Sequence, residues 1–227
     1  YNADLKWEWF PKKGEVISVT AFGKYIQNPI SRVTVNSSSN SVSFVNIGDK
    51  GHVFGVEMEF RKDLYQNNNT RIYTFLNGTY LNTNQELDRE KVVAETTTSY
   101  SNTISIDPSK SSDKMQGASD FLANLNLGFE QKWGSQNSLD LVVSYSHISD
   151  NIYAIGYANK GNLVDKAINV LDAVAKVKFA NGIGFSVSGK NLLNPSFKRV
   201  QENTNGDVSV RDYKKGSNIG VGVSYEF

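Results

Sequence analysis

The last eleven residues of the chain, SNIGVGVSYEF, alternate without interruption between apolar side chains and small or polar ones. Successive side chains of a β-strand point to opposite faces, so this segment predicts a strand with one apolar and one polar face. Its apolar face would consist of Ile219, Val221, Val223, Tyr225 and Phe227. The pattern recurs along the chain, with aromatic residues near the strand ends. Repeated strands of this kind are typical of a transmembrane β-barrel.

Nine segments follow the pattern, with lengths near the ~9–11 residues that a tilted strand needs to cross a bilayer. They cover about 2–10, 15–26, 53–64, 71–81, 121–133, 139–150, 171–180, 182–192 and 217–227. In each segment, charged residues such as Glu57, Lys176 and Glu226 fall on the face opposite Leu127, Val143 and their like, which we expect to face lipid. The segment 71–81 is ambiguous, because both of its faces carry aromatic or apolar groups.

The connections between these segments alternate between short and long. The short ones are Pro11–Gly14, Tyr65–Thr70, Gly134–Asn137 and the Asn181–Gly182 dipeptide, which is typical of a two-residue hairpin. The long ones are 27–52, 82–120, 151–170 and 193–216, rich in Ser, Asn, Thr and Gly. Short turns on one side and long loops on the other are typical of outer-membrane barrels.

Two of the long connections allow a more detailed expectation. We expect 27–52 to continue the neighbouring strands and to turn at Ser37–Ser39, and 82–120 to form a surface loop.

The fold class predicted is therefore all-β, an antiparallel up-and-down transmembrane β-barrel. Nine strands place the two ends of the chain on opposite sides, whereas bacterial single-chain barrels have even strand numbers. An open sheet would leave unpaired backbone groups in lipid, which costs several kcal/mol per group. We therefore interpret residues 1–227 as the C-terminal part of a larger barrel, and expect no signal peptide within it.

Composition narrows the function classes. With 24 basic and 23 acidic residues the chain is nearly neutral, which gives no electrostatic support for nucleic-acid binding. Without cysteine it can form neither disulfides nor thiolate metal sites. The mean hydropathy of -0.41 does not argue against a membrane location, because only every second barrel residue faces lipid.

Several stretches resemble the C-terminal barrel of TonB-dependent outer-membrane receptors. In order, they are NADLKWEWFPKKG, ISVTAFGKYIQNPI, VNIGDKGHVFGVEMEF, FSVSGKNLLNPSF and the closing VGVSYEF. The resemblance covers nearly the whole chain outside the long loops and depends on the order and spacing of the motifs.

This resemblance implies a 22-stranded barrel in the bacterial outer membrane, of which this chain supplies about nine strands, with the N-terminal strands and a plug domain lying outside it. Such receptors import a scarce nutrient: a siderophore, haem, cobalamin, an oligosaccharide or a peptide. The implied partners are outer-membrane lipid, the rest of the barrel with its plug, TonB through the N-terminal part, the barrel-assembly machinery and the small nutrient ligand.

Candidate site residues are few. The loop aromatics Tyr100, Tyr153, Tyr157 and Tyr213 could stack on a ligand, or serve only for loop packing. By resemblance, Val223, Tyr225 and Phe227 form the signal that the barrel-assembly machinery recognises.

No catalytic, metal or cofactor site is expected. Glu57 and Glu59 are better explained as neighbours of wall lysines than as an acid/base pair. The histidines His52 and His147 lack further ligands at metal-binding spacing, and NTNGD (Asn203–Asp207) is more simply a turn than a calcium loop.

Three alternatives remain open at the sequence level. A passive diffusion porin would lack a plug domain upstream. A surface β-sandwich adhesin would bury its Trp and Phe residues between two sheets. An enzyme would require a nucleophile–base pair or a metal cluster, and neither stands out.

Overall fold

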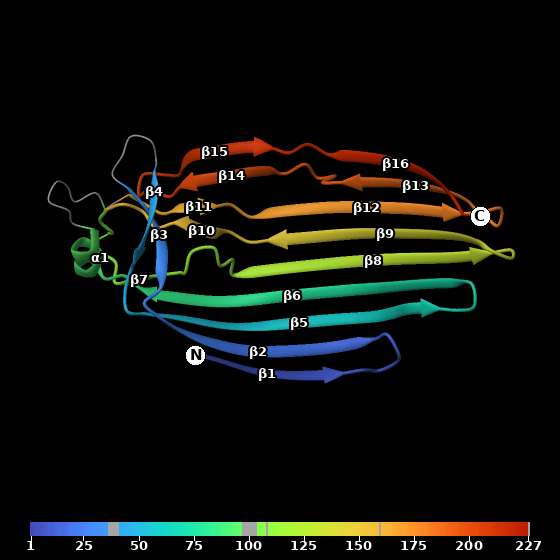
Figure 1. The fold of residues 1–227 in the computed structure, drawn as a ribbon, viewed down its shortest axis with the longest axis horizontal. Helices are drawn as coiled ribbons and strands as arrows, with labels where there is room; N and C mark the ends of the chain where they lie inside the picture. Colours follow the sequence, from blue (N-terminus) through green and yellow to red (C-terminus); the bar gives the residue numbers. More distant parts are fainter. Residues whose placement is uncertain (36–40, 97–103, 108, 159, 227) are drawn as a thin grey trace.

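Nine long antiparallel strands form one continuous sheet, which we call the wall (Figure 1). The structure is a computed structural model and describes residues 1–35, 41–96, 104–107, 109–158 and 160–226. In spatial order the wall consists of β1 (Asn2–Trp9), β2 (Val16–Gln27), β5 (Lys50–Gln66), β6 (Thr70–Glu86), β8 (Phe121–Trp133), β9 (Asn137–Ile148), β12 (Ile168–Lys178), β13 (Ile183–Lys190) and β16 (Asn218–Tyr225). All nine segments predicted from the sequence are therefore strands.

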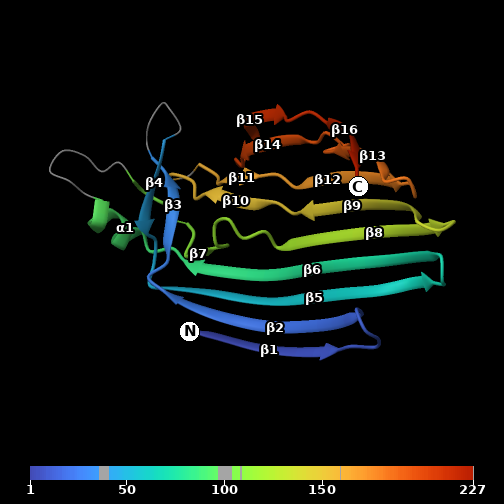
Figure 2. The same ribbon diagram turned by 45° about the vertical axis from the view of Figure 1, so that its right-hand side comes forward.

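Each wall strand pairs with the next one along the wall, as in an up-and-down barrel. The short turns gather at one end and the long connections at the other, and the two chain ends lie on opposite sides (Figure 1). The wall is open, because β1 and β16 form its two edges and do not pair with each other. Its curvature is visible in the second view (Figure 2).

The register of the wall separates an apolar face from a mainly polar one. Leu127 pairs with Val143 and Val143 with Ala173, so this apolar face is continuous across three strands. It is also uncovered within the described chain: Val221 is 83% exposed. On the other face, Asn126 pairs with Ser144. Large exposed apolar surfaces mark contact with lipid or another partner, and one this broad suits a bilayer.

The register also resolves the ambiguous strand β6. Leu76 pairs with Leu125 on the apolar face, so Tyr73 and Phe75 lie on the polar face. Tyr73 fits there because its partner is Gly128: a Cβ at that glycine would lie 2.1 Å from the Tyr73 ring. Arginines accompany both rings. The Arg71 guanidinium lies 4.5 Å from the Tyr73 ring centre, and Arg71 also forms ion pairs with Asp63 and Glu130.

Beyond the wall, two of the long connections extend it as a second, four-stranded sheet. Its order is β10 (Asn151–Ala154), β11 (Leu163–Asp165), β14 (Ser196–Gln201) and β15 (Val208–Lys214). In chain order β10 follows β9, β11 precedes β12, β14 follows β13 and β15 precedes β16, so the strand order of the wall is kept. These segments, expected only as loops, thus continue the barrel-like pairing.

The connection 27–52 differs in part from its expected course. It does form a hairpin, β3 (Ile30–Thr34) paired with β4 (Val42–Asn46), but this hairpin is a separate two-stranded sheet. It runs across the end of the wall instead of prolonging β2 and β5 (Figures 1 and 2). The change of direction follows Asn28, whose φ of 48° is left-handed, and Pro29, which cannot donate to a ladder. The expected turn at Ser37–Ser39 lies outside the described residues.

The connection 82–120 is more than a surface loop. It contains the end of β6, the helix α1 (Arg89–Thr96) and the short strand β7 (Ser112–Asp113), which pairs with β6. Among the described residues, no helix is both long and apolar enough to cross a membrane.

A hydrophobic core lies among the long connections. We call the β3–β4 hairpin, α1, β7 and the four-stranded sheet together the cap. Its core joins residues from three connections: Val33, Val45, Ile47, Leu87, Val92, Ile104, Ile106, Ile152 and Ile155. A parallel bridge between Val33 and Ile155 connects the hairpin to the segment after β10. The cap is therefore packed like a small water-soluble domain.

Candidate ligand-binding site

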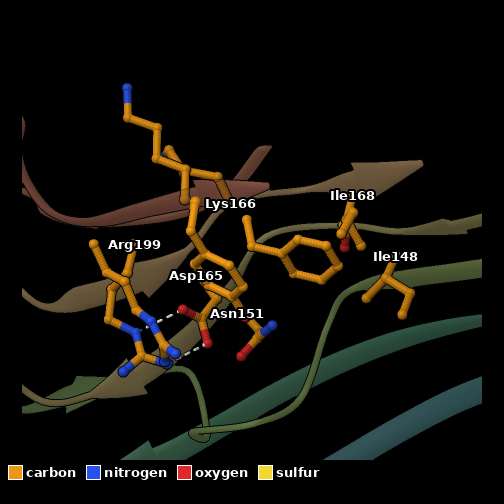
Figure 3. Close-up of a pocket in the computed structure, with 11 residues that line it drawn as sticks. Ile148, Asn151, Asp165, Lys166, Ile168 and Arg199 are labelled. Carbon is orange, nitrogen blue, oxygen red and sulfur yellow. Dashed lines mark hydrogen bonds and ion pairs between the residues drawn. The ribbon is translucent and has the colours of Figure 1, made fainter. Parts of the chain in front are cut away.

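A pocket of about 200 Å³ lies where the four-stranded sheet meets the wall (Figure 3). Its floor includes Ile148, the last residue of β9, and Ile168, the first of β12, which pair with each other. By register both belong to the polar face of the wall. The pocket therefore lies at the long-loop end of the wall, beside two residues of its polar face.

The charged residues of the pocket lining are mainly basic: Lys166, Lys198, Arg199 and Arg211 stand against the single acid Asp165. Arg199 and Asp165 form a bidentate ion pair, with Nε–Oδ1 at 2.6 Å and Nη2–Oδ2 at 2.9 Å (Figure 3). Burial opposes the charge of Arg199, but the hydrogen bonds and attraction of Asp165 outweigh it, so the pKa of the guanidinium is raised. Arg199 is thus a charged residue of the pocket lining that Asp165 holds in position.

Lys166 and Arg211 differ in how far their charges are balanced. Lys166 pairs with Asp150 at 2.8 Å and with Glu202 at 3.3 Å. The hydrogen bond to Asp150 contributes most to raising the pKa of Lys166. Arg211, in contrast, forms no ion pair within the described part of the chain, and lies 4.6 Å from the centre of the Tyr213 ring. Arg211 and Lys198 are therefore the two lining cations that no described carboxylate neutralises, and the guanidinium of Arg211 is suited to bind an anionic group.

Two aromatic rings complete the pocket. Phe197 and Tyr213 pair across β14 and β15 and stack with ring centres 5.3 Å apart. Arg211 lies over the Tyr213 ring, and Lys215 lies over the Phe197 ring, 4.1 Å from its centre. Stacked rings with flanking cations can hold a planar or sugar-like group beside a negative charge.

The predicted loop aromatics are not brought together as one cluster. Tyr213 lines the pocket. Tyr153 is not part of the lining but contacts it, with its ring centre 3.1 Å from the guanidinium carbon of Arg199. Tyr157 lies in the turn after β10 and is not part of the lining. Tyr100 is outside the described residues.

Sequence reasoning missed Phe197, Arg199 and Arg211 as site residues. They fall in the loop 193–216, where basic and aromatic residues look like those of any exposed connection. The alternation of Phe197, Arg199 and Gln201 is a weak strand signal that could have placed them on one face.

The proposed assembly signal occupies the last strand. Val223 pairs with Phe185 and Tyr225 with Ile183, so both lie on the apolar face of β16, at an edge of the wall. The terminal Phe227 lies outside the described residues. Within those residues no group of three or more His, Cys, Asp or Glu could hold a metal ion, and NTNGD forms a turn in which Gly206 N donates to Asn203 O.

These features define the class of the protein: part of the wall of an up-and-down transmembrane β-barrel, with long connections at one end whose described residues share a packed core. The family of TonB dependent receptor-like β-barrels matches residues 1–192. The chain belongs to this family of receptors and transporters, whose members reside in the outer membrane of Gram-negative bacteria.

Two solved structures share the fold. One is the FrpB iron transporter from Neisseria meningitidis (F3-3 variant), with 13% identity and a TM-score of 0.52. The other is a mutant (R480A_Q482A) of the ferric enterobactin receptor PfeA from Pseudomonas aeruginosa, with 14% identity and a TM-score of 0.52. Each match covers 100% of this chain and 31% of the other chain, so the chain spans about a third of either protein. No curated protein matches the sequence.

Proposed function

We propose that this chain is part of an outer-membrane receptor that imports a scarce nutrient with energy delivered through TonB. The observation that carries the proposal is the continuous apolar face of the wall, opposite a continuous polar face, in a chain of the TonB-dependent receptor family. Such a wall is stable only with lipid on one side and a polar lumen on the other.

In this proposal residues 1–227 supply the C-terminal part of the barrel and its extracellular connections. Strands pairing with the open edges β1 and β16, the plug domain and the TonB-contacting segment would come from the rest of the protein. The edge strand β16, with Val223, Tyr225 and Phe227, would present the signal for the barrel-assembly machinery.

The ligand would meet the pocket at the long-loop end as it enters the lumen. Arg211 would hold an anionic or strongly polar group, and Phe197 and Tyr213 would stack on an adjacent flat surface. No catalytic step is involved, because the role of these residues is to bind and release.

Uptake assays test the proposal. A strain without this protein and a strain without TonB are grown on limiting ferric siderophores, haem, cobalamin, oligosaccharides or peptides. Ferric compounds come first because the two similar structures are an iron transporter and a ferric enterobactin receptor. We expect both strains to lose the same nutrient source. Uptake that needs this protein but persists without TonB would indicate a passive porin instead.

The pocket is tested in the same assay once the nutrient is known. Arg211→Met and Tyr213→Leu should each reduce uptake at limiting concentration more than at saturation, since they weaken capture. Arg89→Met, on α1 and outside the pocket lining, is the matched control and should leave uptake unchanged.

A further inference from the structure

The ring of Tyr153 is in contact with two arginines that belong to different connections. The guanidinium carbon of Arg199, on β14, lies 3.1 Å from the ring centre, and that of Arg32, on β3, lies 4.2 Å from it. Arg32 also donates from Nη1 to the backbone oxygen of Tyr153 at 3.3 Å. One aromatic side chain thus connects the β3–β4 hairpin to the four-stranded sheet.

The contacts continue on both sides of this ring. On the hairpin, Arg32 also lies over Phe44, 5.3 Å from its ring centre, and these two residues pair across β3 and β4. On the sheet, Arg199 is held by Asp165 and forms part of the pocket lining. A row of contacts therefore runs from the pocket through Arg199, Tyr153 and Arg32 to the outer face of the hairpin.

The opposite face of the hairpin is held differently. Val33 and Val45 are buried in the cap core, and the backbone amides of Thr34 and Ile155 donate across the parallel bridge at 2.9 Å. These contacts hold the hairpin against the cap core and the segment after β10, and none of these residues lines the pocket. The row of contacts through Arg199, Tyr153 and Arg32, in contrast, connects the hairpin to the pocket through charged side chains.

We propose that Arg32, Tyr153 and Arg199 form a latch that couples the pocket to the seating of the β3–β4 hairpin. Tyr153 screens two like charges from each other and attracts both through its ring face. A ligand anion bound at Arg211 lies beside Arg199, because these two residues pair across β14 and β15. When the anion draws Arg199 away, the Tyr153 ring loses one of the two cations that hold it, and its hold on Arg32 and the hairpin weakens. Capture of ligand and opening of the cap are then one event. The role of the ligand rests on the proposed function, whereas the coupling itself does not.

Hydrogen exchange of the complete protein in lipid nanodiscs tests the coupling without any ligand. The perturbing variant is Tyr153→Leu, which keeps an apolar side chain but removes the ring, and Tyr153→Phe keeps the ring. We expect Tyr153→Leu to speed exchange of the Thr34 and Ile155 amides by about tenfold, the loss expected for cation–π contacts, and Tyr153→Phe to resemble the wild type.

The matched control is Tyr213→Leu. Tyr213 also stacks on an arginine of the pocket, but its ring partners among the described residues, Arg211 on β15 and Phe197 on β14, are not in the hairpin, so this variant should leave exchange in the hairpin unchanged. A second perturbation, Arg199→Met, acts from the pocket side and should speed hairpin exchange as Tyr153→Leu does. Unchanged hairpin exchange in Tyr153→Leu, or equal acceleration in Tyr213→Leu, would overturn the latch. Neither result depends on nutrient uptake, so the latch and the receptor function can fail separately.

Discussion

The wall and the cap of this molecule use apolar side chains in opposite ways. In the wall, large residues such as Val221 and Leu5 are 83% and 77% exposed, and small polar residues such as Ser144 lie on the other face. In the cap, Val33, Ile47 and Ile106 are completely buried. One chain thus contains an apolar surface that lipid would cover and an apolar core that is stabilised because its side chains are removed from water. The boundary between them is the long-loop end of the wall strands.

The largest effect is expected from emptying the cap core. Ile47→Ala removes a completely buried side chain and should destabilise the cap by about 2–5 kcal/mol. Protease cleavage of the cap at increasing urea concentrations measures this loss. Ile30→Ala, at the start of β3 in the hairpin that directly precedes Ile47, is 65% exposed, so it is the control and should change little. If Ile47→Ala also abolished the shifted mobility of the folded barrel on unheated gels, the stability of the wall would not be independent of the cap.

A charge on the apolar face should damage the wall and spare the cap. Val143→Arg, midway along β9, should destabilise the barrel by about 2–4 kcal/mol, the cost of an arginine at the bilayer midplane. The measurement is the folded fraction of the complete protein in lipid vesicles as urea is raised. Ser144→Arg places the same charge one residue away, on the polar face, and should be tolerated. Equal losses in both variants would refute the assignment of the faces.

A smaller effect should follow from filling the gap beside Tyr73. In Gly128→Ala the new Cβ would meet the ring at 2.1 Å, and such overpacking costs about 1–3 kcal/mol. The same vesicle titration measures it. Gly78→Ala serves as the control, since its nearest atom would be the Leu122 carbonyl oxygen at 3.6 Å. Adding Tyr73→Ala to Gly128→Ala should recover part of the loss, and no recovery would count against this explanation.

The smallest effect concerns an exposed ion pair in the cap. The hydrogen bond from Lys91 to Asp49, 2.7 Å long, lowers the pKa of the Asp49 carboxyl. The pair therefore stabilises the cap above the ordinary aspartate pKa of about 3.9, and this contribution is lost as the pH falls through the lowered value. Protection of the Asn28 amide, which donates to Asp49 O, should decrease over that range. Lys91→Met should remove this pH dependence, and a decrease that persists in the variant would assign it elsewhere.

The sequence predicts the wall far better than the cap, because lipid imposes a strict period of two on every strand. The alternation in 217–227 or 121–133 has one structural solution, and all nine strands were found in that way. In the cap, α1 buries only Val92, so REKVVAET carries no apolar stripe that would mark a helix. The strands β10, β11 and β14 are three to six residues long, too short for alternation to be distinguished from chance.

The site shows the same limit. Tyr153 and Tyr213 could be named as candidates because aromatic residues are conspicuous in polar loops. Their arginine partners could not. The contact of Arg199 with Tyr153 requires β11 and β14 to be neighbours in the sheet, although two wall strands, β12 and β13, lie between them in the sequence. Contacts of that kind depend on the strand order of the folded sheet, which no local pattern contains.

The length of β5 and β6 sets the height of the molecule above the cell surface. Each has 17 residues. At about 3.3 Å per residue such a strand is about 56 Å long, and tilted by about 45° it still rises about 40 Å. The apolar band of these barrels is only about 25 Å tall. In the proposed receptor the two strands would therefore act as a stalk that carries the cap clear of the lipid headgroups, and a large particle such as an antibody would meet the cap before it met the membrane.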